Sequence, residues 1–100
     1  MKNQQRVREI IEQYGLSTDV WVRYTDLTSE IGELGKELLK SCDYGNQSVT
    51  ATNDMAMELG DTLFSLICLA ETLNIDLNTS LDAAIEKYRI RFAECGQIGS

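Results

Sequence analysis

Acidic residues recur at one-turn spacing in two parts of the chain. Glu30, Glu33 and Glu37 follow one another at intervals of three and four residues, and Glu58 is followed three residues later by Asp61. Residues three or four apart share one face of an α-helix, so each set is predicted to form a row of carboxylates on a helix. Facing rows of carboxylate oxygens are the arrangement that holds Mg²⁺ or Mn²⁺ in proteins.

The absence of histidine and the wide spacing of the cysteines restrict the metals that the chain could bind. The chain has no histidine, and Cys42, Cys68 and Cys95 are far apart, with no C-x-x-C pair. Histidine is the commonest general base and nitrogen ligand, so any metal here is predicted to be a hard cation held by oxygen. The cysteines fit reduced thiols better than a disulfide framework or a zinc site, which predicts a cytoplasmic protein.

The charge balance bears on the partners of the protein. Nine basic and sixteen acidic residues give a formal net charge of −7. Nucleic acids and anionic membranes both need a basic surface, so neither is predicted as a partner, and a phosphate ligand would need a divalent cation beside it. The polar N-terminus predicts no signal peptide. The longest apolar stretch, residues 59–73, contains Asp61 and is too short to cross a bilayer.

Helical patterning extends over the whole chain and predicts one all-α domain over residues 1–100. Proline is absent, glycine is sparse, and no segment alternates like a strand. A chain of this length buries a limited share of its surface, so we expect a four-helix, bundle-like fold completed by oligomerisation, as a homodimer or a tetramer. The expected helices run from Asn3 to Tyr14, from a Ser17 or Thr18 cap to Ser41, from Thr52–Asp54 to Asn74, and onward from an Asn78 or Thr79 cap. Gly15 and Asn74 are suited to the left-handed conformation at the ends of the first and third helices.

The expected third helix is apolar around most of its circumference, which predicts a buried central helix. Its polar residues, Glu58 and Asp61 among them, fall on one narrow stripe, so two carboxylates are placed where a compensating cation is needed. A structural ion-pair network with lysines or arginines is the alternative to a metal, and Lys36, Lys40, Lys87 and Arg91 are its possible partners. The core is expected to include the apolar stripes Val20, Tyr24, Leu27, Ile31, Leu34 and Leu38 of the second helix, and Leu81, Ile85, Tyr88 and Phe92 of the fourth.

The expected fourth helix carries Lys87 and Arg91 four residues apart on one polar side. Two interpretations stay open from the residues alone. The pair could be a solvated helix end whose cations complement the helix dipole, or it could clamp a phosphate group. Trp21, Tyr24 and Tyr44 could stack on a base, although such aromatic residues more often belong to a core or an interface.

The acidic motifs resemble those of a known family. Ser29-Glu30-Ile31-Gly32-Glu33-Leu34, followed by Met57-Glu58-Leu59-Gly60-Asp61, resembles the E-E-x-x-E then E-x-x-D signature of MazG-like proteins in the all-α NTP pyrophosphatase superfamily. The resemblance covers about residues 15–93. It implies that Glu30, Glu33, Glu58 and Asp61 bind Mg²⁺ and that Lys87 and Arg91 contact phosphates. Ser29 stands where the pattern has its first glutamate, so a catalytic role is not carried over to that position.

The activity that this resemblance implies is Mg²⁺-dependent hydrolysis of a ribo- or deoxyribonucleoside triphosphate to the monophosphate and pyrophosphate, for house-cleaning or control of a nucleotide pool. Mn²⁺ is a possible substitute. Because histidine is absent, a carboxylate must accept the proton of the attacking water, and Glu33 and Glu37 are the candidates. Two alternatives belong to other classes: a nucleotide- or metal-binding regulator without turnover, and a structural helical dimer.

Overall fold

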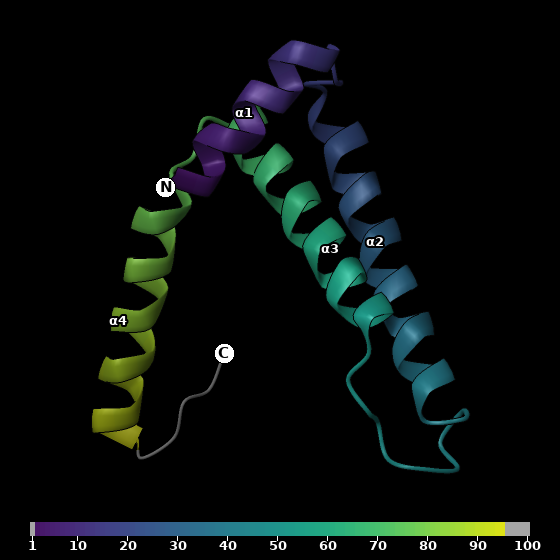
Figure 1. The fold of residues 1–100 in the computed structure, drawn as a ribbon. Helices are drawn as coiled ribbons and strands as arrows, with labels where there is room; N and C mark the ends of the chain where they lie inside the picture. The colour runs from purple at the N-terminus through teal and green to yellow at the C-terminus, as the bar shows by residue number, and fades with distance from the viewer. Residues whose placement is uncertain (1, 96–100) are drawn as a thin grey trace.

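The computed structural model describes residues 2–95, which fold into four α-helices with no strand among them (Figure 1). The all-α prediction is therefore confirmed. Within this range no helix is long and apolar enough to cross a membrane. The helices are α1 (Lys2–Tyr14), α2 (Val20–Ser41), α3 (Asn53–Thr72) and α4 (Leu77–Cys95).

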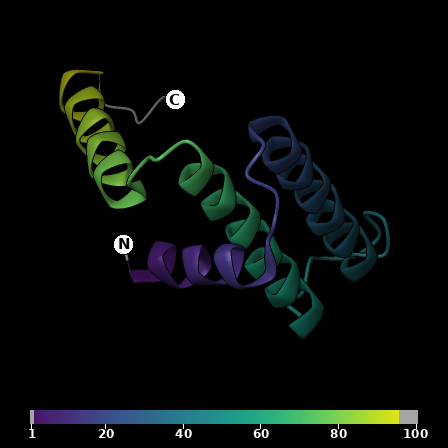
Figure 2. The same cartoon turned by 90° about the horizontal axis from the view of Figure 1, so that it is seen from above.

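Helices α2 and α3 form an antiparallel hairpin, which is the most extensive contact between helices in the chain (Figures 1 and 2). Their connection begins with consecutive turns in which Asp43, Tyr44 and Gly45 adopt positive φ angles. The second-largest contact is made by α1, which crosses α3 near its C-terminal half. Val7 and Ile11 of α1 pack there on Ile67 and Cys68 of α3 to form the buried core cluster.

Two of the predicted helix ends are confirmed and two predicted caps are wrong. Gly15 after α1 and Asn74 after α3 both adopt left-handed φ angles, of 61° and 56°. The cap of α2 is Asp19 rather than Ser17 or Thr18, and its carboxylate accepts hydrogen bonds from the amides of residues 21 and 22. A carboxylate is favoured at this place because it also complements the positive end of the helix dipole.

The start of α4 differs from the prediction in the same way. The helix begins at Leu77, ahead of the expected Asn78 or Thr79 cap, and the Asp76 carboxylate accepts a hydrogen bond from the Asn78 amide at 3.0 Å. This hydrogen bond lowers the pKa of Asp76. An aspartate thus stands at the N-terminal end of both α2 and α4.

A buried glutamine fixes the place where α4 starts. The Gln4 amide nitrogen donates to the Ile75 carbonyl at 2.7 Å and to the Glu71 carboxylate at 3.0 Å, while its oxygen accepts from the Leu77 amide at 2.7 Å. Arg8 donates to the same carboxylate. Helix α1 is therefore tied to the turn between α3 and α4 by polar contacts as well as by the core.

Beyond this turn α4 extends away from the rest of the chain (Figure 1). None of its described residues is buried, so the prediction that its apolar stripe lies in the core is wrong for the single chain: Leu81, Ile85 and Phe92 are exposed and Tyr88 is half-buried. The radius of gyration, 16.5 Å, exceeds the roughly 13 Å of a compact domain of this length. Helical periodicity identifies an apolar face but not the element that covers it.

The same correction applies to the hairpin. Helix α3 is not buried all round, because Met57, Leu59, Leu63 and Leu66 are exposed on it. On α2, the stripe residues Leu27 and Leu34 are half-buried, but Val20, Tyr24, Ile31 and Leu38 are exposed. Part of each predicted core stripe therefore faces outward in one chain.

Candidate metal centre

Three carboxylates from two helices meet in the seam between α2 and α3. Glu30 of α2 and Glu58 and Asp61 of α3 each place one carboxylate oxygen within 4.8 Å of the others. All three side chains are half-buried. The separation is one that a single divalent cation can span with oxygen ligands.

The seam has this composition because each helix turns a polar row toward the other. On α2 the row contains Arg23, Glu30 and Glu37, seven residues apart, so they recur on one side of the helix. On α3, Glu58 and Asp61 are one turn apart and the buried Ser65 continues the row. Since the helices are antiparallel, Glu30 comes to lie opposite the glutamate and aspartate of α3.

The electrostatics of the cluster are those of crowded acids without a counter-charge. Burial raises the pKa of Glu58, and the charges of Asp61, Glu30, Glu33 and Glu37 raise it further. Among residues 2–95, none of the three clustered acids forms an ion pair. Carboxylates held together in this way are suited to a divalent cation.

The structure places the other two acidic candidates beside the cluster rather than in it. Glu33 is exposed on α2 and lies outside the close group, although its charge acts on Glu58. Glu37 is partly buried and accepts a hydrogen bond from Lys40 at 3.2 Å, which raises the pKa of Lys40. One of the lysines considered for a structural ion-pair network is thus bound to Glu37 and not to the three clustered acids.

Lys87 and Arg91 are not brought to the acids within one chain. They lie on α4, which makes little contact with α2 or α3 (Figure 1). Lys87 places its ammonium 4.6 Å from the centre of the Tyr88 ring. Trp21 and Tyr24 form an edge-to-face pair on α2 with ring centres 6.1 Å apart, and both rings are exposed.

A buried arginine at the other end of the seam was not predicted. Arg23 is 9% exposed; it donates to Asp26 at 2.6 Å, and its Nε has no hydrogen-bond partner. It lies near Cys68; burial raises the pKa of that thiol, and the nearby guanidinium of Arg23 opposes the rise. The seven-residue spacing to Glu30 is the signal in the sequence that could have placed Arg23 in the seam.

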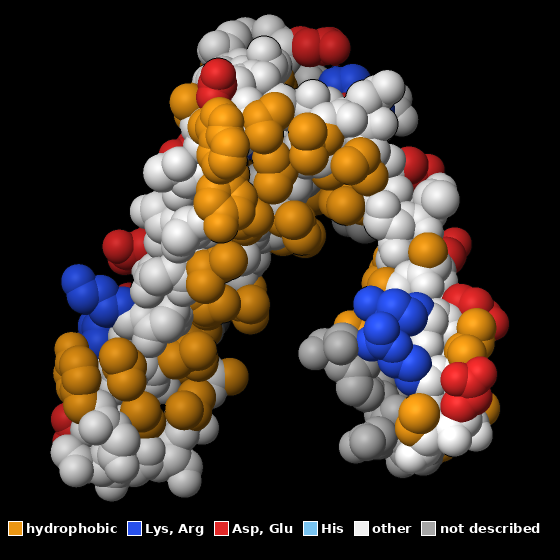
Figure 3. Space-filling model, turned by 180° about the vertical axis from the view of Figure 1, so that it is seen from behind, with side chains coloured by type: hydrophobic (Ala, Val, Ile, Leu, Met, Phe, Trp, Pro, Cys, Tyr) orange, Lys and Arg blue, Asp and Glu red, His pale blue; other side chains and the backbone are white. Residues whose placement is uncertain are grey.

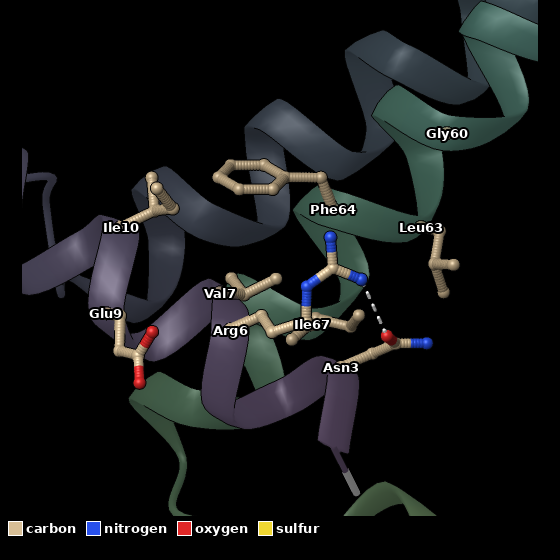
Figure 4. Close-up of a pocket in the computed structure, with 9 residues that line it drawn as sticks. All are labelled: Asn3, Arg6, Val7, Glu9, Ile10, Gly60, Leu63, Phe64 and Ile67. Carbon is tan, nitrogen blue, oxygen red and sulfur yellow. Dashed lines mark hydrogen bonds between the residues drawn. The ribbon is translucent and has the colours of Figure 1, made fainter.

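A separate hollow of about 580 Å³ lies between α1 and α3 (Figure 4). Phe64, Leu63 and Ile67 line it from α3, and Val7 and Ile10 line it from α1. Arg6 and Asn3 are joined by a hydrogen bond of 3.2 Å at its edge. None of the clustered acids lines this hollow, so it is distinct from the candidate metal centre.

Comparison with known proteins places the chain in a family. The MazG nucleotide pyrophosphohydrolase domain matches residues 23–95, a range that includes every acid of the seam. The chain belongs to this family. Divalent-metal dependence is general among MazG domains, in agreement with the acidic cluster.

Two comparisons with the same relative agree with the MazG assignment. The chain is 41% identical over 68 residues to YpjD, an uncharacterized protein of Bacillus subtilis, and the match covers 65% of this chain but 60% of the relative's length. The crystal structure of YpjD, described as a candidate pyrophosphatase, matches with a TM-score of 0.72 at 34% identity. That match covers 88% of this chain and 90% of the crystallised one, so the all-α architecture is shared.

Proposed function

We propose that this MazG domain hydrolyses a ribo- or deoxyribonucleoside triphosphate to the monophosphate and pyrophosphate with Mg²⁺, in the house-cleaning or control of a nucleotide pool. The observation that carries the proposal is the meeting of Glu30, Glu58 and Asp61 between two helices without a basic ion-pair partner among residues 2–95. A structural ion-pair network, the main alternative, needs such a partner. The family match supplies the substrate class, a nucleotide with a phosphoanhydride bond.

The ligands proposed for the metal are Glu30, Glu58 and Asp61, with Glu33 as a fourth from the adjacent turn of α2. When bound, Mg²⁺ or Mn²⁺ supplies charge neutralisation at the phosphates and lowers the pKa of a bound water. The carboxylates fit this role because their oxygens converge and their charges are otherwise unopposed. The protein's part is to fix these oxygens on two packed helices.

We propose Glu33 or Glu37 as the acceptor of the water's proton. Glu37 already accepts a hydrogen bond from Lys40 at 3.2 Å, which occupies one of its carboxylate oxygens and favours Glu33 as the acceptor. Lys87 and Arg91 are proposed to contact the substrate phosphates, as their spacing on one side of α4 suggests. For that contact, α4 of the same or a second copy must close on the acidic seam.

The proposed enzyme is a cytoplasmic homodimer or tetramer that binds a nucleoside triphosphate and neither nucleic acid nor membrane. The net charge of −7 disfavours polyanionic partners, and the exposed apolar faces of α2, α3 and α4 favour assembly.

The direct test is a panel of nucleoside triphosphates incubated with Mg²⁺ and analysed for all phosphate products. We expect monophosphate and pyrophosphate without a diphosphate intermediate, and loss of both products when the metal is chelated. Diphosphate and orthophosphate as the primary products would contradict the proposed bond cleavage. Nucleotide binding without any product would favour the regulator, and a melting temperature that Mg²⁺ leaves unchanged would favour the structural dimer.

A further inference from the structure

Arg23 is a buried cation that its own chain leaves incompletely hydrogen-bonded. The residue is 9% exposed, and its Nη2 donates to the Asp26 carboxylate at 2.6 Å. Its Nε is buried without a hydrogen-bond partner among residues 2–95. A guanidinium carries five N–H donors and no acceptor, and a buried donor without an acceptor costs the free energy of its lost hydration. The proposed reaction gives this side chain no part, although it lies in the same seam as the acids.

Stability alone does not account for an arginine at this position. The side chain of its partner Asp26 is 53% exposed and lies three residues further along the same helix, and ion pairs of that kind contribute little to the free energy of unfolding. The neighbouring Cys68 is fully buried, and a thiol is a weak acceptor. An apolar side chain of similar length would fill the same space without the cost of burying a charge. A buried donor without a partner therefore points to a ligand that completes it.

The Arg23 guanidinium lies in line with the acidic cluster. Arg23 precedes Glu30 by seven residues, which is about 10 Å along α2. On the antiparallel α3, the buried Ser65 follows Asp61 by about one turn. Cys68, which lies beside Arg23, comes three residues later. The seam therefore runs from the three acids, past the Ser65 side chain, to the guanidinium.

One side of the seam is polar and exposed along α2. Asp26 and Glu33 are exposed, and each comes three residues after a member of the row that faces α3, so both lie on one side of that row. Tyr24 and Ile31 come one residue after a member of the row and lie on the other side, which is apolar. Figure 3 shows hydrophobic side chains in a band along the leg made by α2 and α3. Because Asp26 holds the guanidinium at the polar edge, a ligand bound to the acids can reach it there.

The distance from the acids decides which part of a nucleotide reaches Arg23. A span of about 10 Å along the helix is longer than a pyrophosphate group and comparable with a nucleoside joined to its first phosphate. With the phosphates at the metal, the base therefore comes to the arginine end of the seam. Arginine is suited to a base, because its planar fork of donors matches the carbonyl oxygen and ring nitrogen on the edge of guanine.

We propose that Arg23 binds the base of the nucleotide by donating to a carbonyl oxygen on its edge, an inference that rests on the proposed function. Guanine and the pyrimidines present such an oxygen, whereas adenine presents ring nitrogens and an amino group that is itself a donor. The guanidinium has no acceptor, so it cannot pair with that amino group. Arg23 is therefore a specificity-determining residue that disfavours adenine nucleotides.

Binding of uncleavable nucleotides tests this contact apart from the reaction. In calorimetric titrations with Mg²⁺, the parent protein should bind the α,β-imido analogues of CTP and GTP more tightly than that of ATP. Arg23→Met should raise the dissociation constants of the first two about tenfold, the effect of one hydrogen bond to a charged group, and so remove most of the preference. Pyrophosphate should bind both proteins equally, because it lies at the acids. Lys36→Met, which removes an exposed cation from another side of α2, is the matched control and should bind all three analogues as the parent does.

Each other outcome has a distinct meaning. Weaker binding of pyrophosphate to Arg23→Met, with an unchanged preference among the analogues, would place a phosphate on the arginine and overturn the contact with the base. A parent protein that binds the three analogues equally would overturn it as well. If the parent binds neither the analogues nor pyrophosphate, the proposed function itself fails.

A purely structural role for Arg23 predicts a different result. Without ligand, Arg23→Met should melt at the temperature of the parent or above it, because the change removes an incompletely bonded buried charge. A lower melting temperature with unchanged nucleotide binding would show that the arginine serves the fold alone. If far-UV circular dichroism shows that Arg23→Met loses its helices, Arg23→Lys replaces it, since lysine keeps the charge without the planar fork. A reduced preference for the CTP analogue over the ATP analogue then supports the contact, and an unchanged preference contradicts it.

Discussion

The α2–α3 hairpin and α4 have similar residue patterns but differ in how their helices pack within the chain. Each has apolar residues at helical spacing and charged residues one turn apart. In the hairpin the two helices pack on each other and bring three acids within 4.8 Å. Helix α4 has no buried residue and leaves Lys87 away from those acids. A helical pattern therefore predicts the side of the helix on which a residue lies, whereas its neighbours depend on how the helices pack.

This difference divides the candidate site into two parts. The acidic part is preorganised, because residues of two packed helices hold it and mutual repulsion is already present at Glu58. The cationic part is conditional, because Lys87 and Arg91 reach the substrate only if α4 of the same or a second copy packs beside the acidic seam. Each of the following variants tests one side of this contrast.

The largest effect is expected from Glu58→Gln in the hairpin. Loss of a metal ligand should lower kcat/KM by more than about a hundredfold. The melting temperature without metal should stay level or rise, because the change removes repulsion from Asp61 and Glu30, and the stabilisation by added Mg²⁺ should shrink. Activity assays and thermal melts with and without Mg²⁺ measure both. Glu86→Gln on α4 is the control. A large loss of metal-free stability would instead indicate a structural ion pair.

A smaller effect is expected from the cations of α4. Lys87→Ala and Arg91→Ala should each raise KM about tenfold, since one hydrogen bond to a charged group is worth about 1.5–3 kcal/mol. The stabilisation by Mg²⁺ alone should be unchanged, because the metal ligands lie on α2 and α3. Arg89→Ala, which changes a cation on another side of the helix, is the control. Equal KM values for all three variants and the parent would contradict a contact between α4 and the substrate.

Much of the fold was predictable because helix formation is local. The absence of proline, the left-handed positions at Gly15 and Asn74, and the one-turn spacing of Glu58 and Asp61 all depend on a few neighbouring residues. The distance between Glu30 and the acids of α3 depends on the antiparallel packing of α2 on α3, which the one-turn spacing of the acids does not specify.

The unpredicted features depend on contacts between distant residues. Gln4 is an ordinary polar residue in the sequence, and its burial arises from contacts with Ile75 and Leu77 more than seventy positions away. The exposure of Leu81 and Phe92 could not be predicted, since periodicity is the same for a face that a second copy covers. Glu33 and Glu37 show the same limit: their spacing places them on the acidic side but does not set their distance from Asp61.

A change in the pH dependence of stability is expected when the contact between Arg8 of α1 and Glu71 of α3 is removed. A hydrogen bond from Arg8 lowers the pKa of Glu71, so this glutamate stabilises the fold fully above its ordinary pKa of 4.5, and the contribution is lost as the pH falls through the lower, folded value. Arg8→Met should be less stable at neutral pH and lose less stability below pH 4.5. Chemical unfolding at several pH values measures this. Parallel pH profiles for the two proteins would be evidence against the Arg8–Glu71 coupling.

The smallest effect compares the two aspartates that stand at helix starts. Asp19→Ala should lower the free energy of unfolding by about 1 kcal/mol, because α2 is packed on α3 and its N-terminal amides lose an acceptor. Asp76→Ala makes the same change at α4 and should cost less in global stability, because α4 contributes little packing within its chain and can lose helical structure alone. Urea unfolding, followed by far-UV circular dichroism, separates a shifted midpoint from a sloping helical baseline. Thr18→Ala is the control for the first variant, since its side chain does not cap α2. Equal shifts of the midpoint for Asp19→Ala and Asp76→Ala would mean that α4 unfolds together with the hairpin, and the contrast between the preorganised and the conditional parts of the site would not hold.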